Sequence, residues 1–406
     1  MRANFSNSTR QLVAERAGYK CSFPTCGRIT IGPAIDPHKS VNSGIAAHIY
    51  GAALSGQGPR GSGRLSKSEL ESPQNAIWLC AHHSTLIDKN QGSDFPPGIL
   101  HSYKALHETR IAHEVAGIHT PFGWVHNFTV ESSPLFSHSF RIDLAKLNLI
   151  VGENSVGKTA LCEWIAGVSD PKYFERWEEF SPDNLRPLCA GVEYFNPNRH
   201  SIEVDLSSNQ YPRYKLDGEE TYVSTNSVRV TFPESIEPLY QETPNDLETV
   251  VNSIKLHPYE IRALCDQLKN NSDLFAGAHF ERSEEGTYMH VQVNGKTGIE
   301  ERLLSMLASS ERERLMMELG IIAANKLSMT GPSILILDAN SWQINTKWLE
   351  RYGEFLGSPA CRFQTIASTR STDIDFGSLA WAGWKVIALD GVPPNASVAT
   401  GVGKAP

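Results

Sequence analysis

The chain has 406 residues, of which 40% are hydrophobic and 20% charged, and its formal net charge is −8. This composition is typical of globular domains and excludes disordered and fibrous classes, while the length predicts two or three domains. We expect no transmembrane helix, because no apolar run approaches roughly 18 residues, and no secretory signal, because the first residues lack an apolar core. Seven cysteines, an odd number, argue against a disulfide framework. We therefore expect a protein of the reducing cytoplasm that does not associate with membranes.

Charge is distributed unevenly along the chain. Residues 1–117 contain 12 Lys and Arg against 8 Asp and Glu, together with seven of the 14 His and three of the seven Cys, whereas the remainder is acidic. Any contact with a polyanion is therefore expected in the N-terminal part. A predicted helix over 97–116, followed by a turn at 120–123, indicates the boundary between two domains. We expect an N-terminal domain over 1–117, a second domain over 118–392 and a flexible tail over 393–406.

The N-terminal region contains two pairs of candidate metal ligands. Cys21 and Cys26 flank a short turn, and Cys80 is followed by His82 and His83. Three thiolates and one imidazole provide the four ligands of a tetrahedral Zn²⁺ site. The two-residue gap after Cys80 favours His83 over His82 as the fourth ligand. The alternative interpretation is that these cysteines are ordinary buried thiols.

Further candidate residues lie between and after these pairs, in Ala-Ala-His-Ile at 46–49, Asn-Ala-Ile-Trp-Leu-Cys at 75–80 and Ser-Thr-Leu-Ile-Asp at 84–88. This order of a ligand pair, a strand with His, an Asn and a second pair that opens a helix resembles the HNH endonucleases, which have a ββα-metal fold. The resemblance covers residues 10–115. It is greatest to the HNH modules of bacterial anti-phage effectors, including the HNH–SAVED nucleases of CBASS systems and the HNH partner in Septu systems.

The resemblance implies metal-dependent hydrolysis of phosphodiesters, with His48 as the general base and Asn75 holding it in orientation. An imidazole with a pKa of about 6.5 can accept a proton at cellular pH. Asp88 lies four residues after Ser84, on the same side of a predicted helix, and is the candidate ligand of a catalytic Mg²⁺ or Mn²⁺. Two positions depart from the family, because Ala47 and Ser84 stand where many members carry metal-binding residues. A purely structural zinc module therefore stays open as an alternative.

A nucleotide-binding motif follows an apolar run with strand propensity at 147–151. The sequence Gly-Glu-Asn-Ser-Val-Gly-Lys-Thr over 152–159 leads into a helical pattern. In such a loop backbone N–H groups surround phosphates, the lysine reaches the β- and γ-phosphates and the threonine holds Mg²⁺. A second apolar run, over 333–337, is followed by Asp338, which we predict to be the Walker B aspartate. The predicted ATP–Mg²⁺ site consists of Gly152, Asn154, Gly157, Lys158, Thr159 and Asp338.

The C-terminal region resembles, over 122–392, the ABC-type ATPase heads of the RecF, Rad50, SMC and OLD group. A signature-like segment at 307–311 opens a predicted helix over 312–326, as in those heads. We expect strands at 201–206, 221–232 and 287–293 and a helical lid near 247–269. The region has no long heptad pattern, which excludes a Rad50-like coiled-coil arm.

Three departures from the head family bear on ATP hydrolysis. Ala339 follows the Walker B aspartate where a polarising Glu is usual, Ser310 replaces a signature glycine, and the predicted switch strand ends in Thr369-Arg370 instead of a histidine. Loss of the carboxylate alone should slow hydrolysis on the order of 10²–10⁴-fold if it acts as general base. The resemblance thus implies ATP binding and dimerisation with weak or absent hydrolysis. Substitutes for the lost carboxylate stay open, namely Glu311, Asn340 and Arg370.

The sequence therefore predicts a two-domain α/β protein, a ββα-metal HNH nuclease followed by an ABC-ATPase-like P-loop domain. The first hypothesis is a DNA endonuclease controlled by ATP binding and acting in anti-phage defence, as a homodimer or higher homo-oligomer, with or without a partner defence protein. The second is a non-catalytic zinc- and DNA-binding scaffold whose ATP-driven dimerisation recruits another nuclease. A third, in which the ATPase is the working enzyme, is disfavoured by Ala339. The direction of ATP control and the choice between DNA and RNA stay open.

Overall fold

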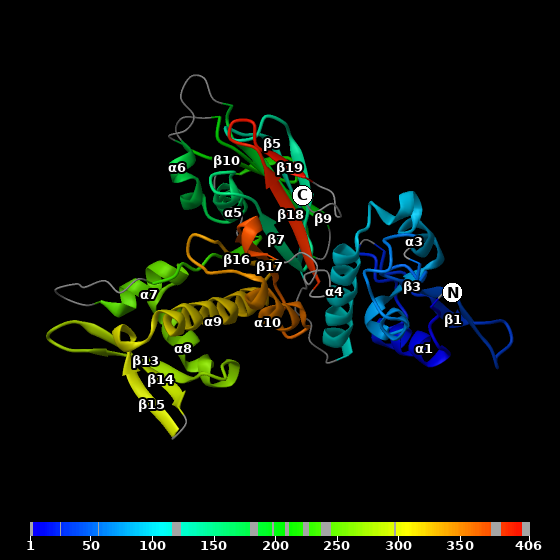
Figure 1. Ribbon diagram of the computed structural model, residues 1–406, viewed down its shortest axis with the longest axis horizontal. Helices are drawn as coiled ribbons and strands as arrows, with labels where there is room; N and C mark the ends of the chain where they lie inside the picture. Colours follow the sequence, from blue (N-terminus) through cyan, green and yellow to red (C-terminus); the bar gives the residue numbers. More distant parts are fainter. Residues whose placement is uncertain are drawn as a thin grey trace.

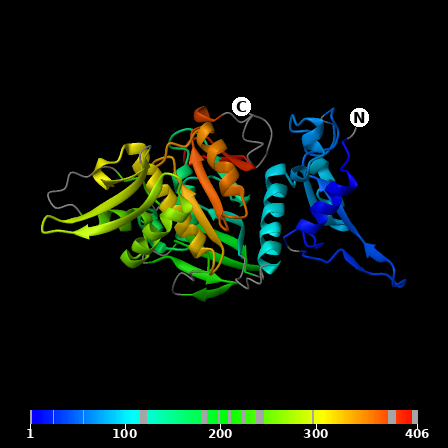
Figure 2. The ribbon, with the colours of Figure 1, turned by 90° about the horizontal axis from the view of Figure 1, so that it is seen from below.

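The computed structural model shows an N-terminal module and a larger C-terminal domain, with the helix α4 (Pro97–Val115) between them (Figures 1 and 2). The expected boundary between 117 and 118, and most of the expected turn at 120–123, lie outside the described residues. The structure describes residues 3–24, 26–55, 57–115, 123–178, 186–196, 199–207, 211–221, 227–236, 245–295, 298–374 and 383–399.

The N-terminal module is built on a two-stranded antiparallel sheet followed directly by a helix. His48 pairs with Ala76 and Gly44 with Cys80 in this sheet. The second strand is buried along its whole length because Ile77 faces the module's main core while Trp78 faces α1. This double burial explains its uninterrupted apolar sequence. The elements are α1 (Asn7–Arg16), β1 (Ile31–Pro33), β2 (Ser40–Asn42), β3 (Gly44–His48), α2 (Lys67–Leu70), β4 (Ala76–Cys80), α3 (Ala81–Leu86) and α4.

Helix α4 confirms the helix expected at 97–116 and packs on both parts of the chain. Tyr103 and Leu106 share one hydrophobic core with residues of β4 and with Trp124 of the C-terminal domain. On the same helix the Ser102 hydroxyl accepts a hydrogen bond from the backbone N–H of Lys146 at 2.7 Å. The N-terminal module is therefore docked on the second domain by a shared core and a buried polar contact.

The C-terminal domain contains a mostly parallel sheet with the strand order β12-β16-β17-β7-β18-β19, in which only β19 is antiparallel to its neighbour. A second, antiparallel sheet has the order β11-β10-β9-β8-β5-β6. The strands of both sheets are β5 (Trp124–Ser132), β6 (Phe140–Asp143), β7 (Leu147–Val151), β8 (Cys189–Phe195), β9 (Arg199–Asp205), β10 (Arg213–Leu216), β11 (Glu219–Thr221), β12 (Arg229–Thr231), β16 (Ser333–Leu337), β17 (Gln364–Thr369), β18 (Trp384–Asp390) and β19 (Ser397–Ala399).

The parallel sheet is covered on both faces. Leu149 of β7 belongs to a core formed with α9, whereas its neighbour Ile150 belongs to a core formed with α5 and the antiparallel sheet. Burial on both faces explains the continuous apolar strands that the sequence shows. The helices of this domain are α5 (Lys158–Gly167), α6 (Glu175–Glu178), α7 (Asp246–Ile254), α8 (Pro258–Asn271), α9 (Ser309–Leu327) and α10 (Thr346–Gly357).

A third, three-stranded sheet consists of β13 (Phe275–Arg282), β14 (Thr287–Gly295) and β15 (Gly298–Leu303), beside α7 and α8. These two helices correspond to the expected lid near 247–269. Between α5 and α9 the longest helix in the described residues is α8, with 14 residues, so no coiled-coil arm is seen there. Short 3-10 helices occur at Pro73–Asn75, Lys89–Gly92, Pro171–Phe174, Leu304–Met306 and Ser371–Asp373.

The expected flexible tail begins too early at residue 393. Strand β19 pairs with β18, matching Ser397 with Asp390, and Ala396 is fully buried, so the domain extends to at least residue 399. Residues 400–406 lie outside the described part of the chain. No described helix is both long enough and apolar enough to cross a membrane. All seven cysteines are free thiols in the structure, consistent with the expected lack of a disulfide framework.

Candidate active site

The expected metal ligands Cys21, Cys26, Cys80 and His83 come together. One donor atom from each lies within 4.8 Å of all the others. The Nδ1 atom of His83 is 3.3 Å from Sγ of Cys80 and 3.6 Å from Sγ of Cys21. In a tetrahedral zinc site, with bonds of about 2.3 Å to sulfur and about 2.0 Å to nitrogen, sulfur and nitrogen lie about 3.5 Å apart. The donor set and its spacing therefore fit Zn²⁺.

Of the two adjacent histidines, His83 is the one that lies beside the thiols. His83 points its Nδ1 at the thiols, and its ring stacks on Phe23 with the ring centres 4.0 Å apart. Burial lowers the pKa of His83, which favours the neutral imidazole that binds metals. His82 is exposed, on the outer side of α3. The cluster ties the segment around Cys21 to the junction of β4 and α3.

His48, the candidate base, ends strand β3, where its ring stacks on Phe5 with a centroid distance of 3.9 Å. The expected orienting residue, Asn75, is buried. Its Oδ1 accepts from the N–H of Tyr50 at 2.7 Å, and its Nδ2 donates to the carbonyls of Tyr50 and Leu70. Asn75 thus fixes the backbone two residues after His48.

One pocket of about 470 Å³ contains two of the three candidate catalytic residues, His48 and Asp88, while Asn75 is not among its lining residues. His48, Ser84 and Asp88 all line it. The sequence predicted that Asp88 lies on a helix with Ser84. The helix α3 ends at Leu86 with Ile87 as its cap, so Asp88 lies just beyond the helix. It still faces the same pocket as Ser84. The mouth of the pocket also carries Lys89, which is exposed.

Arg60 lines the same pocket. Its side chain is only 3% exposed. The guanidinium donates to the carbonyls of Ile49 at 2.6 Å, Ile87 at 2.5 Å and His48 at 2.9 Å. It also pairs with Oδ1 of Asp88 at 2.6 Å. Arg60 therefore joins the end of β3 to the end of α3 and orients the carboxylate of Asp88.

The predicted phosphate loop connects β7 with α5, as expected. Gly157 caps α5 with a φ of 102°, a left-handed conformation that favours glycine. A Cβ atom on Gly152 would lie 2.8 Å from the carbonyl oxygen of Leu389, so only glycine fits there. Lys158 donates to the carbonyls of Gly152 and Glu153 at 2.9 and 2.6 Å, and burial lowers its pKa. The exposed Asn154 lies within this loop.

The Walker B aspartate contacts the loop directly. Oδ2 of Asp338 accepts from the Thr159 hydroxyl at 2.9 Å, and Nδ2 of Asn340 donates to the same hydroxyl at 2.9 Å. Oδ1 of Asp338 accepts from Ser368 on β17, whose hydroxyl also accepts from the N–H of Ala339. These oxygen ligands are of the kind that Mg²⁺ prefers. A nucleotide's phosphates and Mg²⁺ would be held by the loop, Thr159 and Asp338.

The residue after Asp338 is Ala339, which has no carboxylate. Two of the expected substitutes, Glu311 and Asn340, make other contacts. Glu311 accepts from the backbone N–H of Ala308 at 2.8 Å, so it caps α9. Asn340 is an amide that touches Thr159 and carries no basic oxygen of carboxylate strength. The hydroxyl of Thr369, at the end of the predicted switch strand, donates to the carbonyl of Ile344 at 2.6 Å. Arg370 is exposed, and its charge contributes to lowering the pKa of Lys158.

Residues 24–92 match the family model of the HNH endonucleases. The chain carries an HNH endonuclease domain. The match includes His48, Asn75 and Asp88, while Cys21 lies just before it. This confirms the N-terminal part of the expected resemblance. No curated protein sequence matches the chain.

The solved structures that are similar to this chain include SMC head domains and RecF. An SMC head domain from Thermotoga maritima is 15% identical, covering 68% of this chain and 98% of its own, with a TM-score of 0.41. An SMC head from Pyrococcus furiosus is 10% identical, with coverages of 68% and 96% and a TM-score of 0.45. RecF, described as a recombination mediator, is 10% identical, with coverages of 69% and 99% and a TM-score of 0.46. The HNH part of the expected fold class is confirmed by the family match. The mostly parallel sheet and the loop between β7 and α5 agree with the expected α/β P-loop domain.

Three functional contacts were not predicted from the sequence. Phe5 covers His48, Arg60 organises the HNH pocket, and Ser368 holds the Walker B aspartate. The position of Ser368 directly after the apolar run of β17 is the one available signal, because side chains at the carboxyl ends of neighbouring parallel strands meet at one edge. Phe5 and Arg60 carry no comparable local signal.

Proposed function

We propose that the protein is a metal-dependent DNA endonuclease whose HNH domain is controlled by ATP binding in the P-loop domain. The observation that carries the proposal is the shared pocket of His48, Ser84 and Asp88 beside a cluster suited to zinc. His48 accepts the proton of the attacking water, and Asn75 keeps the backbone after His48 in place. A Mg²⁺ or Mn²⁺ ion held by Asp88 would neutralise charge on the phosphate.

The nuclease part is tested by cleavage of plasmid DNA with Mg²⁺ or Mn²⁺. We expect nicking by the wild type and a loss on the order of 10²–10⁴-fold in His48→Ala. His38→Ala is the matched control, because His38 is an exposed histidine of the same module, outside the pocket. Equal cleavage by wild type and His48→Ala would exclude His48 as the base. A parallel assay with RNA distinguishes the substrate.

We propose that the P-loop domain binds ATP and hydrolyses it weakly or not at all. Binding is supported by the geometry of Lys158, Thr159 and Asp338. Slow hydrolysis is supported by Ala339, whose side chain offers no general base, and by the capping role of Glu311. By resemblance to ABC-type heads, ATP would be bound between two copies of the chain, in a homodimer or higher homo-oligomer.

A direct route for ATP control lies in strand β7. The carboxyl end of β7 leads into Gly152 of the phosphate loop. Lys146, the residue before the amino end of β7, donates its backbone N–H to the hydroxyl of Ser102 on α4. The buried Lys146 ammonium also donates to the carbonyl of Phe363 at 2.6 Å, just before β17. A shift of β7 on nucleotide binding would therefore reach α4, which packs on the HNH core. Such control requires that ATP binds the cleavage-competent and the inactive conformation of the protein with different affinities.

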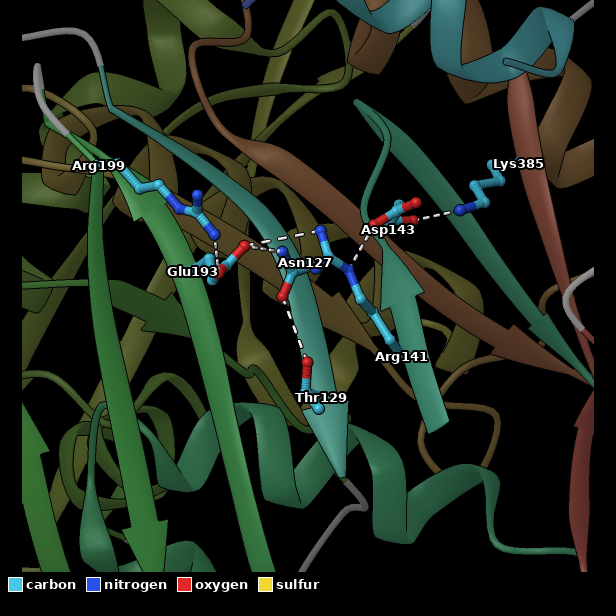
Figure 3. Close-up of polar contacts among 7 residues, drawn as sticks. All are labelled: Asn127, Thr129, Arg141, Asp143, Glu193, Arg199 and Lys385. Atoms are coloured by element: carbon cyan, nitrogen blue, oxygen red, sulfur yellow. Dashed lines mark hydrogen bonds and ion pairs between the residues drawn. The ribbon is translucent and has the colours of Figure 1, made fainter. Parts of the chain in front are cut away.

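The charged surface beside this route joins five strands (Figure 3). Arg141 of β6 pairs with Asp143 at 3.1 Å and with Glu193 of β8 at 3.6 Å, and Glu193 also binds Arg199 of β9 and Asn127 of β5. Lys385 of β18 donates to the carbonyl of Asp143. The antiparallel sheet and β18 are thus linked near the end of β6, next to the docking site of α4.

The second candidate is a zinc- and DNA-binding scaffold that recruits another nuclease. It is favoured by the small number of metal-binding side chains near His48. Among the described residues, no group of three His, Cys, Asp or Glu donors includes His48. DNA binding without cleavage by the wild type, under every metal condition, would support it. The role in anti-phage defence rests on the resemblance to effector modules. It is tested by phage infection of cells that carry wild type or His48→Ala.

A further inference from the structure

The outer face of the three-stranded sheet presents two facing histidines. His279 of β13 is the cross-strand partner of His290 of β14, and their rings stack with centroids 5.1 Å apart. The opposite face of these strands is apolar, with Met289 and Val291 fully buried in the core. Period-two alternation therefore places the histidines toward solvent. The sheet lies at the end of the molecule opposite the HNH domain (Figures 1 and 2).

Two carboxylates flank the histidine pair. Oε1 of Glu301, on β15, is 3.3 Å from Nδ1 of His290. Glu281, on β13, lies 3.5 Å from Nε2 of each histidine. Donor atoms of His279, His290 and Glu301 all lie within 4.8 Å of one another. These three residues come from three different strands, so one ion would join the whole sheet.

We propose that His279, His290 and Glu301 bind a divalent transition-metal ion, Zn²⁺ in the cell, which stabilises the sheet β13–β15. Two imidazoles and one carboxylate form a donor set that Zn²⁺ accepts, with a water molecule in the fourth position. Donor atoms in such a site lie about 3.4 Å apart. The side chains are 44%, 23% and 46% exposed, so small rotations close the remaining distance. Glu281, 3.5 Å from Nε2 of each ring, orients the imidazoles.

Cobalt substitution tests this site separately from the cysteine cluster. The full-length chain is purified without metal and titrated with Co²⁺ in the absence of nucleotide. Thiolate-to-cobalt charge-transfer absorption reports the Cys21 cluster, whereas visible ligand-field bands report every bound tetrahedral cobalt ion. We expect the double variant His279→Gln/His290→Gln to bind one equivalent less than the wild type, with the thiolate band unchanged. The unchanged band shows that the cysteine cluster is intact, and an unchanged far-ultraviolet circular dichroism spectrum shows that the rest of the variant is folded.

Two further variants sharpen the result. His200→Gln is the matched control, because His200 contacts a single carboxylate, that of Asp217, at 2.7 Å, and it should bind as much cobalt as the wild type. Glu301→Gln should weaken the second site at least tenfold. Equal cobalt stoichiometry in the wild type and the double histidine variant would overturn the proposal. So would a loss of the same size in His200→Gln, since this would indicate nonspecific binding to surface histidines.

Discussion

The guanidinium of Arg60 holds together the segments that form the HNH pocket. Its donors satisfy three backbone carbonyls and one carboxylate, and its side chain is almost fully buried. A planar fork with five donors can meet these acceptors at once, whereas an ammonium cannot. At the scale of single residues, the pocket therefore depends on side chains that shape it as well as on those that react.

Replacing Arg60 with lysine distinguishes a shaping role from a phosphate contact. Arg60→Lys keeps the charge but loses hydrogen bonds to the carbonyls of Ile49, Ile87 and His48. We expect the free energy of unfolding to fall by about 2–3 kcal/mol, with cleavage reduced at least tenfold. Urea unfolding and plasmid nicking measure the two effects. Unchanged stability and activity would mean that a positive charge alone is what the position requires.

Asn75 gives a second prediction at this scale. Asn75→Ala removes three hydrogen bonds from a buried site next to His48. A buried polar group left without its partner costs on the order of 1–3 kcal/mol. We expect a loss of this size in urea unfolding, together with loss of cleavage and normal zinc content. Full cleavage by a folded Asn75→Ala protein would contradict a positioning role.

Among the elements, the cysteine cluster and β7 carry the longest-range connections. The cluster joins the segment at Cys21 to β4 and α3, which also contact it through the module's main core and a backbone hydrogen bond from Ser22 to Trp78 at 2.9 Å. Strand β7 is central in the parallel sheet, between β17 and β18, and connects α4 to the phosphate loop. Each element therefore links a functional residue to a distant part of the chain.

Zinc removal should loosen the HNH domain selectively. The four ligands come from two separate segments, so chelation removes the metal–ligand bonds that join these segments. The binding free energy of a structural zinc ion contributes to the free energy of folding. We expect hydrogen exchange to speed up in β3, β4 and α3 after chelation, with the P-loop domain protected as before. Re-addition of Zn²⁺ should restore protection. Unchanged exchange in the HNH domain would rule out a structural metal there.

The buried Lys146 gives a pH dependence. Burial lowers the pKa of Lys146 to about 8, from an ordinary 10.5. Between these values the unfolded chain binds more protons than the folded one, so this lysine makes stability rise with pH across that window. Lys146→Met should reduce the rise in the free energy of unfolding between pH 8 and 10.5. An identical pH profile for both proteins would contradict a lowered pKa.

At the scale of the whole molecule, local motifs could be predicted and distant contacts could not. The phosphate loop and the Cys–His pairs are short segments whose spacing carries the chemistry. In contrast, Phe5 reaches His48, and Ser368 reaches Asp338, only through the tertiary fold. Strand β19 has three residues, too few for a periodic pattern. The docking of α4 on the second domain likewise depends on residues from separate regions of the chain.

The central claim is that ATP in the P-loop domain controls the HNH domain. The most direct test is the rate of plasmid cleavage with and without saturating ATP, in the wild type, Lys158→Ala and Ser102→Ala. Coupling free energies between sites typically correspond to about 5–150-fold effects. We expect ATP to change the wild-type rate at least about fivefold, to have no effect on Lys158→Ala, and to have a smaller effect on Ser102→Ala, which loses the contact to β7. A wild-type rate that is the same with and without ATP would contradict the account.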